Sequence, residues 1–294
     1  MSAFLKRVSR MRMEFPWNLY QRLGMHNLRI NRHALPLRME EIVPLPGLAM
    51  GRLDVTPAEY RRLVELPEMS RFRQYDFVYG KALEYVVSLK ALGILDGSVH
   101  LDAASGYGEY AAAALRLANP ATFYCLDNVR YPRREGQPVR LFGGVECIPL
   151  PDASVDTISC HHSIEHFKGD ADTGFIREVA RVLRPGGRAC ILPLFLASES
   201  LEIWNTRRSE RFDPQARTLY DPFGTFPGWG PCERFARVYS PEAFQRRVLE
   251  AARPLKASLL QVYYDGAIAP NMEHNKHQAK INGHLKVLVL EKAN

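Results

Sequence analysis

The sequence predicts a doubly wound α/β fold: a mostly parallel, seven-stranded, Rossmann-like sheet with helices on both faces. Short apolar segments alternate with helical segments of about 10–15 residues beyond residue 98. The 294 residues suit one α/β domain with an extension, and 46% of them are hydrophobic, as in ordinary globular proteins. The sequence contains no run of about 18 apolar residues, so no membrane-spanning helix is expected.

Residues that typically begin or end a helix predict the first two helices of the domain. Thr56 is a typical N-cap, Pro57 suits the first helical position, and Glu59 lies in the first turn. A longer helix is expected over residues 70–93, where apolar residues recur at helical spacing until Gly93.

The later elements follow from apolar runs and from the residues that interrupt them. Strands are expected over residues 99–102, 122–127, 141–148, 155–160, 188–195, 257–264 and 284–290. An alanine-rich helix is expected to end at Leu117, before Asn119 and Pro120. Two further helices are expected over residues 175–183 and 241–251.

The net charge of +7 lies in a basic N-terminal arm. Residues 1–38 contain eight basic residues and one acidic residue, so the rest of the chain is electrically balanced. A balanced body argues against a nucleic-acid-binding surface. We assign residues 1–56 to the arm and 57–294 to the α/β domain, which has core motifs over 98–195 and an insert after the fifth strand over 196–240.

The arm predicts a helix with an apolar face. Phe4, Val8, Met11 and Phe15 recur at helical spacing, with basic residues around them. A basic amphipathic helix can bind an anionic membrane surface. The alternative is that its apolar face packs against the chain's own body or a second subunit. Because no apolar signal-peptide core occurs in this region, we expect a cytoplasmic protein, peripheral to the inner membrane surface if the membrane contact holds.

The five cysteines show no Cys-x-x-Cys spacing. Four of them lie in apolar segments that are expected to be strands or strand ends: Cys125, Cys147, Cys160 and Cys190. We expect buried, reduced thiols without a disulfide or a zinc site, as is usual in a reducing compartment.

A glycine-rich turn follows the first predicted strand. Gly106 and Gly108 permit close backbone approach by a ligand, although such glycines also occur in purely structural turns. Asp127, which ends the second strand, is placed to accept hydrogen bonds from two ribose hydroxyls. With Ala111 the turn also fits the dinucleotide pattern G-x-G-x-x-G/A. Asp102 would repel a pyrophosphate and suits an ammonium group, which favours S-adenosylmethionine over NAD.

Four linked motifs follow one another in this part of the chain. Residues 101–108 read Leu-Asp-Ala-Ala-Ser-Gly-Tyr-Gly, and Asp127 ends the next strand. Residues 148–156 precede the fourth strand, and residues 164–167 with 177–187 follow it. Together these motifs resemble those of class I S-adenosylmethionine-dependent methyltransferases with a short motif I, the type 11-like group, although alanine and serine replace a usual glycine and cysteine. The resemblance covers about a third of the chain and implies S-adenosylmethionine as the cofactor.

The resemblance implies a set of cofactor-binding residues at neighbouring strand ends. They are Asp102, Ala104, Ser105, Gly106, Gly108, Asp127, Asn128, Glu146, Cys147 and His161. Asp102 is expected near the amino group of the cofactor, and Asp127 on its ribose. The acid that often contacts the adenine amino group aligns with Gly144, so Glu146 or the backbone near Cys147 is expected to substitute.

Transfer to a hydroxyl acceptor also needs a base. The candidates are Glu165 and His166, followed by His162, because similar sugar O-methyltransferases place a histidine at the first or second of these positions. The alternative is a structural role, in which the Glu-His pair holds the next helix. We expect no metal site, since adjacent histidines at a strand end, such as His161 and His162, point in opposite directions.

The acceptor is expected to be a sugar hydroxyl in a bacterial surface polysaccharide or glycoconjugate. Residues 235–240 resemble methyltransferases of bacterial surface-polysaccharide clusters. Aromatic residues and arginines of the insert suit a saccharide or an acidic saccharide, unless the insert is a structural cap: Trp204, Arg207, Arg208, Arg211, Phe212, Tyr220, Phe223, Phe226, Trp229, Arg234 and Arg237. The alternatives are a phenol, quinone or lipid acceptor, an RNA acceptor held by the arm, and an inactive fold that serves as an interaction module.

Overall fold

The computed structural model describes residues 45, 47, 48, 50–74, 80–93, 96–130, 138–206, 210–221, 234–269 and 283–294. The predicted arm helix lies outside the described residues. So do five of the insert residues that are expected to contact the acceptor, namely Arg207, Arg208, Phe223, Phe226 and Trp229. Over the described ranges, no helix combines the length and the apolar character that crossing a membrane requires.

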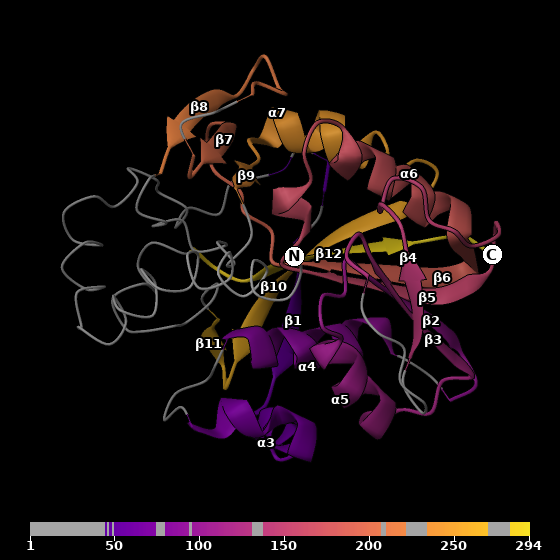
Figure 1. Cartoon of the computed structure of the whole chain (residues 1–294). Coiled ribbons are helices and arrows are strands. Elements are labelled where there is room, and N and C mark those ends of the chain that lie inside the picture. The colour runs from indigo at the N-terminus through magenta and orange to yellow at the C-terminus, as the bar shows by residue number, and fades with distance from the viewer. Residues whose placement is uncertain are drawn as a thin grey trace, which may run out of the picture.

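The core of the described chain is a mixed sheet of nine strands (Figure 1). The strand order is β1-β10-β12-β6-β5-β2-β3-β4, and β11 also pairs with β10. Parallel pairs join β4, β3, β2, β5 and β6 in turn, whereas β12 runs antiparallel to both β6 and β10. The bounds are β1 (Met50–Val55), β2 (Val99–Ala103), β3 (Thr122–Asp127), β4 (Val139–Phe142), β5 (Val155–His161), β6 (Leu183–Leu192), β10 (Lys256–Tyr264), β11 (Ala267–Ile268) and β12 (Lys286–Glu291). The α/β class is confirmed, but the predicted number of seven strands is wrong.

The additional strand β1 comes from a segment that the sequence analysis assigns to the arm. It pairs in parallel with β10, from Leu259 to Tyr264. Leu53 and Val55 are buried and alternate with exposed neighbours, which is the period of two of a half-buried strand. Residues 50–55 therefore belong to the sheet.

Helices cover both faces of the sheet (Figure 1). One face carries α3 (Pro57–Val64), η1 (Pro67–Gln74), α4 (Gly80–Leu92) and α5 (Glu109–Leu117), and the other carries α6 (Ala171–Val182), α7 (Pro241–Phe244) and η3 (Gln245–Leu249). The predicted start of α3 is confirmed, because the Thr56 hydroxyl accepts the Glu59 N–H at 3.2 Å and the Glu59 carboxylate accepts the Thr56 N–H at 2.8 Å. Gly93 follows the end of α4 with a φ of +57°, as the sequence predicts.

The predicted strand over residues 141–148 is wrong beyond Phe142, and the observed strand begins earlier, at Val139. Strand β4 ends at Phe142, because Gly143 and Gly144 begin a turn. Cys147 is consequently exposed, whereas Cys125, Cys160 and Cys190 are buried free thiols in strands, as predicted.

Three other elements differ from the prediction. Strand β6 begins at Leu183, earlier than the predicted range 188–195. The helix predicted over 70–93 is divided between η1 and α4. The helix predicted over 241–251 changes to a π-helical turn at Gln245, and this turn places Arg247 in a buried position.

The insert forms a separate sheet of three strands, with order β8-β7-β9. Its strands are β7 (Leu201–Trp204), β8 (Arg217–Tyr220) and β9 (Phe235–Val238), and they lie beside α6 and α7 (Figure 1). A small apolar cluster of its own supports this sheet: Phe195, Ala197, Leu201, Ile203, Ala236 and Val238.

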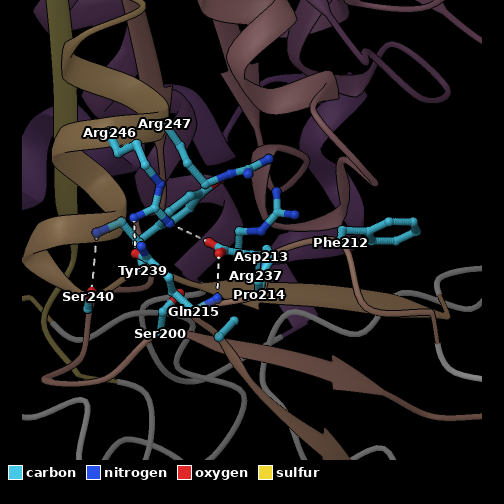
Figure 2. Close-up of polar contacts among 12 residues, drawn as sticks. Ser200, Phe212, Asp213, Pro214, Gln215, Arg237, Tyr239, Ser240, Arg246 and Arg247 are labelled. Carbon is cyan, nitrogen blue, oxygen red and sulfur yellow. Dashed lines mark hydrogen bonds and ion pairs between the residues drawn. The ribbon is translucent and has the colours of Figure 1, made fainter.

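A buried ion-pair network fastens the insert to the helices, where Arg237, Tyr239 and Arg247 converge (Figure 2). The carboxylate of Asp172, in the first turn of α6, accepts bonds from Arg237 at 2.8 Å, from Arg247 at 2.8 and 2.7 Å, and from Tyr239 at 3.0 Å. Arg237 also lies 3.3 Å from Glu202 of β7. Because Arg237 is fully buried, the expectation that it contributes to an acceptor surface is wrong.

Candidate active site

The glycine-rich turn lies between β2 and α5, at the carboxyl edge of the parallel strands. Gly106 and Gly108 have φ values of +53° and +81°, which glycine adopts without strain. A Cβ on Gly106 would meet no atom within 4 Å, so the backbone at this residue faces open space. The turn therefore leaves space for a ligand beside Gly106.

Asp127 closes this turn from the neighbouring strand. Its Oδ2 accepts the Gly106 N–H at 2.8 Å, and its Oδ1 accepts the Val129 N–H at 2.9 Å. The sequence analysis places Asp127 and the glycines in one site, and the structure brings them together. A carboxylate has about four lone-pair directions, so these two bonds leave acceptor capacity for ribose hydroxyls.

Arg140 on β4 holds the same turn from outside, and the sequence analysis does not identify it. Its guanidinium donates to the carbonyls of Gly106 at 3.0 Å and Tyr107 at 2.7 Å. A Cβ on Gly108 would come within 2.5 Å of this guanidinium. A side chain at position 108 would therefore have to displace the end of the Arg140 side chain, and its φ of +81° also favours glycine.

Asp102 lies at one end of a buried row of polar side chains beneath the turn. Its Oδ1 accepts the Ser159 hydroxyl at 2.8 Å, and Ser159 lies 3.1 Å from His100 Nε2. The other ring nitrogen of His100 lies 2.7 Å from the Thr157 hydroxyl. Burial lowers the pKa of His100 to about 3, so its ring is neutral at physiological pH.

His161, at the end of β5, belongs to the same row. Its Nδ1 lies 3.5 Å from Asp102 Oδ1, and its Nε2 lies 2.7 Å from the Ser88 hydroxyl on α4. The ring also packs against Tyr110, with the centroids 4.4 Å apart. His161 and Asp102 therefore orient one another at the edge where the sequence analysis places the methionine part of the cofactor.

His162 lies between two buried carboxylates. Its Nε2 is 2.6 Å from Glu84 of α4, and its Nδ1 is 3.6 Å from Glu165. Burial alone would lower the pKa of His162, but the charge of Glu84 and the contacts with both carboxylates raise it to about 9. At neutral pH this side chain is therefore an imidazolium and is unable to accept a proton.

His166 lies in η2 (Ile164–His166), next to the insert. Its Nδ1 is 2.7 Å from the carbonyl oxygen of Phe235, so this nitrogen carries the proton and donates it. In the neutral ring the lone pair is then on Nε2, which lies 3.8 Å from Glu165 Oε1. This arrangement gives His166 the tautomer that a base requires, with a carboxylate beside the basic nitrogen.

The remaining predicted cofactor residues lie around the turn after β4 and at neighbouring strand ends. Glu146, Cys147 and Asn128 are exposed, and Ala104 is partly buried with a φ of +53°. The Glu146 carboxylate occupies the space next to Gly144, where a Cβ would lie. Glu146 thus stands close to the position that the family's adenine-binding acid would take. Ser105 is held by its N–H, which donates to the Leu126 carbonyl at 3.0 Å.

The part of the chain that the structure describes contains no group of three or more His, Cys, Asp or Glu side chains arranged to hold a metal ion. His161, His162 and His166 are directed to different partners.

Two residues of the site, both on α4, are not predicted from the sequence. Glu84 and Ser88 are one helical turn apart, and they contact the successive residues His162 and His161. The signal for them was present, since both are polar residues on the inward face of a helix that is otherwise largely apolar. Their partners, however, are more than 70 residues away in the sequence.

Comparison with known proteins agrees with this geometry. Residues 101–191 match the family model of a methyltransferase domain. This methyltransferase domain begins in β2 and ends in β6, so it contains the glycine turn, Asp127 and the histidines described above. The match shows that this part of the chain is similar to a methyltransferase domain.

The chain is also similar to individual proteins. A protein of Mycolicibacterium smegmatis named "Probable S-adenosylmethionine-dependent methyltransferase" is 38% identical over 96 residues. This match covers 33% of the present chain and only 30% of the relative.

Solved structures similar to the chain include an S-adenosylmethionine-dependent methyltransferase from Aquifex aeolicus. It is 17% identical, with a TM-score of 0.40 over 80% of this chain and 97% of that one. Another is the Burkholderia thailandensis 1,6-didemethyltoxoflavin-N1-methyltransferase with bound 1,6-didemethyltoxoflavin and S-adenosylhomocysteine. It is 17% identical, with a TM-score of 0.45 over 84% of this chain and 94% of that one.

Proposed function

We propose that the protein is an S-adenosylmethionine-dependent methyltransferase that transfers a methyl group to a hydroxyl oxygen. The observation that carries this proposal is the joint placement of the Gly106 turn and Asp127 at the carboxyl edge of β2 and β3. Ligands of doubly wound sheets bind at this edge. S-adenosylmethionine supplies an electrophilic methyl group there, and the chain's own residues bind it and orient the acceptor.

The histidines support a hydroxyl acceptor with His166 as the base. His166 Nε2 takes the hydroxyl proton as the oxygen attacks, and Glu165 stabilises the imidazolium that forms 3.8 Å away. The Phe235 carbonyl keeps the proton of the neutral ring on Nδ1. His162 does not compete for this role, since its pKa of about 9 keeps it protonated at neutral pH.

The acceptor class that we propose is a sugar of a bacterial surface polysaccharide or glycoconjugate. The supporting feature is a set of insert side chains that stay accessible: Arg211 and Tyr220 are exposed, and Phe212 is partly buried. Aromatic rings together with an arginine suit a saccharide or an acidic saccharide.

Cofactor binding tests the proposal first. Asp127→Ala is expected to weaken S-adenosylmethionine binding about 10- to 150-fold, because a charge-assisted hydrogen bond to the ribose contributes about 1.5–3 kcal/mol. Isothermal titration calorimetry measures the change, and Asp54→Ala at the exposed far edge of the sheet is the matched control. Unchanged affinity in Asp127→Ala would remove the ribose assignment. Binding of NADH without binding of S-adenosylmethionine would overturn the proposed function.

We further propose that the arm brings the enzyme to a cytoplasmic membrane surface. Its surplus of basic residues supports weak, salt-sensitive binding to anionic lipid, with about 1 kcal/mol for each Lys or Arg near the surface. Deletion of residues 1–15 is expected to abolish co-sedimentation with phosphatidylglycerol–phosphatidylcholine vesicles at low salt. The absence of sedimentation by the full chain would contradict this proposal, and dissociation of an oligomer on deletion would favour a contact between subunits.

A further inference from the structure

We propose that Glu84 of α4 is a positioning residue, which acts through His162 to hold the Glu165 carboxylate beside His166. This inference deepens the proposed function and rests on it for the role of His166. It concerns a residue from outside the segment that matches the methyltransferase domain. Glu84 therefore links α4 to the chemistry at the end of β5.

Glu84, His162, Glu165 and His166 lie next to one another in space, in that order. Glu84 is completely buried on α4, and its carboxylate lies 2.6 Å from His162 Nε2. On the opposite side of the ring, His162 Nδ1 lies 3.6 Å from Glu165 Oε1. The same Oε1 lies 3.8 Å from His166 Nε2. The four side chains thus form a row that begins at α4 and ends at the candidate base.

Two buried carboxylates face the His162 ring from different elements. Glu84 faces His162 from α4 and Glu165 faces it from η2, and both carboxylates are buried. Within the described ranges neither carboxylate forms an ion pair with a lysine or arginine, and neither accepts a well-aligned hydrogen bond. Burying an ionised carboxylate without a partner costs several kcal/mol. An imidazolium at His162 is therefore the positive charge that lies between the two carboxylates.

The contact between Glu84 and His162 affects the surroundings of the proposed base, His166. The charge of Glu84 is the largest of the contributions that raise the pKa of His162. The Glu165 carboxylate lies between the resulting imidazolium, at 3.6 Å, and His166, at 3.8 Å. From this position it can stabilise the charge that forms on His166. Without Glu84 the His162 ring loses its shortest contact, at 2.6 Å, and holds Glu165 less firmly beside His166.

The backbone at His162 is consistent with a fixed role for this side chain. His162 has a φ of +47°, which a non-glycine residue adopts at a cost of order 1 kcal/mol or more. Its N–H donates to the Leu192 carbonyl at 3.0 Å, which anchors this conformation to the end of β6. The ring is thereby held between α4 and η2.

Histidine-ring NMR of the full-length chain without added ligand tests the first link. In Glu84→Gln, which keeps the size of the side chain, the pKa of His162 is expected to fall by more than about one pH unit. Glu84→Asp is expected to restore part of the shift, because it restores the charge. Ser88→Ala, one turn away on the same helix, removes a contact with His161 and is expected to leave the pKa of His162 unchanged. An unchanged pKa of His162 in Glu84→Gln would overturn the proposal.

Kinetics test the second link. In Glu84→Gln, the kcat for labelled methyl transfer from S-adenosylmethionine to a panel of sugars and nucleoside-diphosphate sugars is expected to fall at least about 10-fold, while the KM for S-adenosylmethionine is unchanged. A lowered pKa of His162 with an unaltered kcat would refute the positioning role. A full kcat in His166→Asn would instead refute the proposed base, and the histidine-ring NMR would still decide whether Glu84 sets the charge of His162.

Discussion

The His166→Asn variant is expected to transfer methyl groups to a hydroxyl acceptor about 10²–10⁴-fold more slowly than the unmodified chain. Asparagine can still donate to the Phe235 carbonyl, so the local contact with the insert is retained. It offers no basic nitrogen beside Glu165, and the hydroxyl would have to lose its proton to water. The kcat for the panel of sugars measures this loss.

Two further measurements separate chemistry from binding and folding in this variant. The dissociation constant of S-adenosylmethionine is expected to stay within about twofold, because His166 lies on the insert side of the site and away from the glycine turn. The melting temperature is expected to stay close to that of the unmodified chain. Loss of folding in both His166→Asn and Glu165→Gln would support the alternative that the Glu-His pair is structural.

Asp172→Ala is expected to destabilise the protein by about 3–5 kcal/mol, because it leaves two buried arginines without their shared carboxylate. Asp172 is completely buried and binds Arg237, Arg247 and Tyr239. Urea unfolding measures the change in the free energy of unfolding. The control is Asp152→Ala, which removes an exposed ion pair with Arg181 and is expected to cost about 1 kcal/mol or less.

The same network predicts a dependence of stability on pH. Burial alone would raise the pKa of Asp172, but hydrogen bonds from Arg247 and the charge of Arg237 lower it below its ordinary value. A carboxyl whose pKa is lower in the folded state stabilises the protein above its unfolded pKa of about 3.9. That contribution is lost as the pH falls through the folded pKa. Asp172→Ala should therefore flatten the acid side of the stability curve, and an unchanged acid transition would contradict the assignment.

Much of the candidate site could be predicted from the sequence, because its parts lie at the ends of neighbouring strands. Once β2 and β3 are recognised as parallel neighbours, Gly106 and Asp127 must meet at one edge. The placement of His162, Glu165 and His166 after β5 follows in the same way. The spacing of residues along the chain is sufficient for such contacts between neighbouring elements.

The roles of these residues could not be predicted in the same way. The tautomer of His166 depends on a carbonyl of the insert, and the charge of His162 depends on Glu84 of α4. Both are contacts between elements that are distant in the sequence, and only tertiary packing creates them. For Arg237 the predicted role itself is wrong. An arginine in an aromatic insert suggests a contact with a ligand, but the partners of Arg237 are Asp172 and Glu202.

Strand β1 has a practical consequence for anyone who shortens this protein. A chain that starts at residue 98, close to the start of the family match, would lack β1, α3 and α4. The backbone of β10 from Leu259 to Tyr264 would then become an open sheet edge, which is a template for intermolecular strand pairing. Expression trials that begin before Met50 should therefore give monodisperse protein, and trials that begin at the motif should give aggregates.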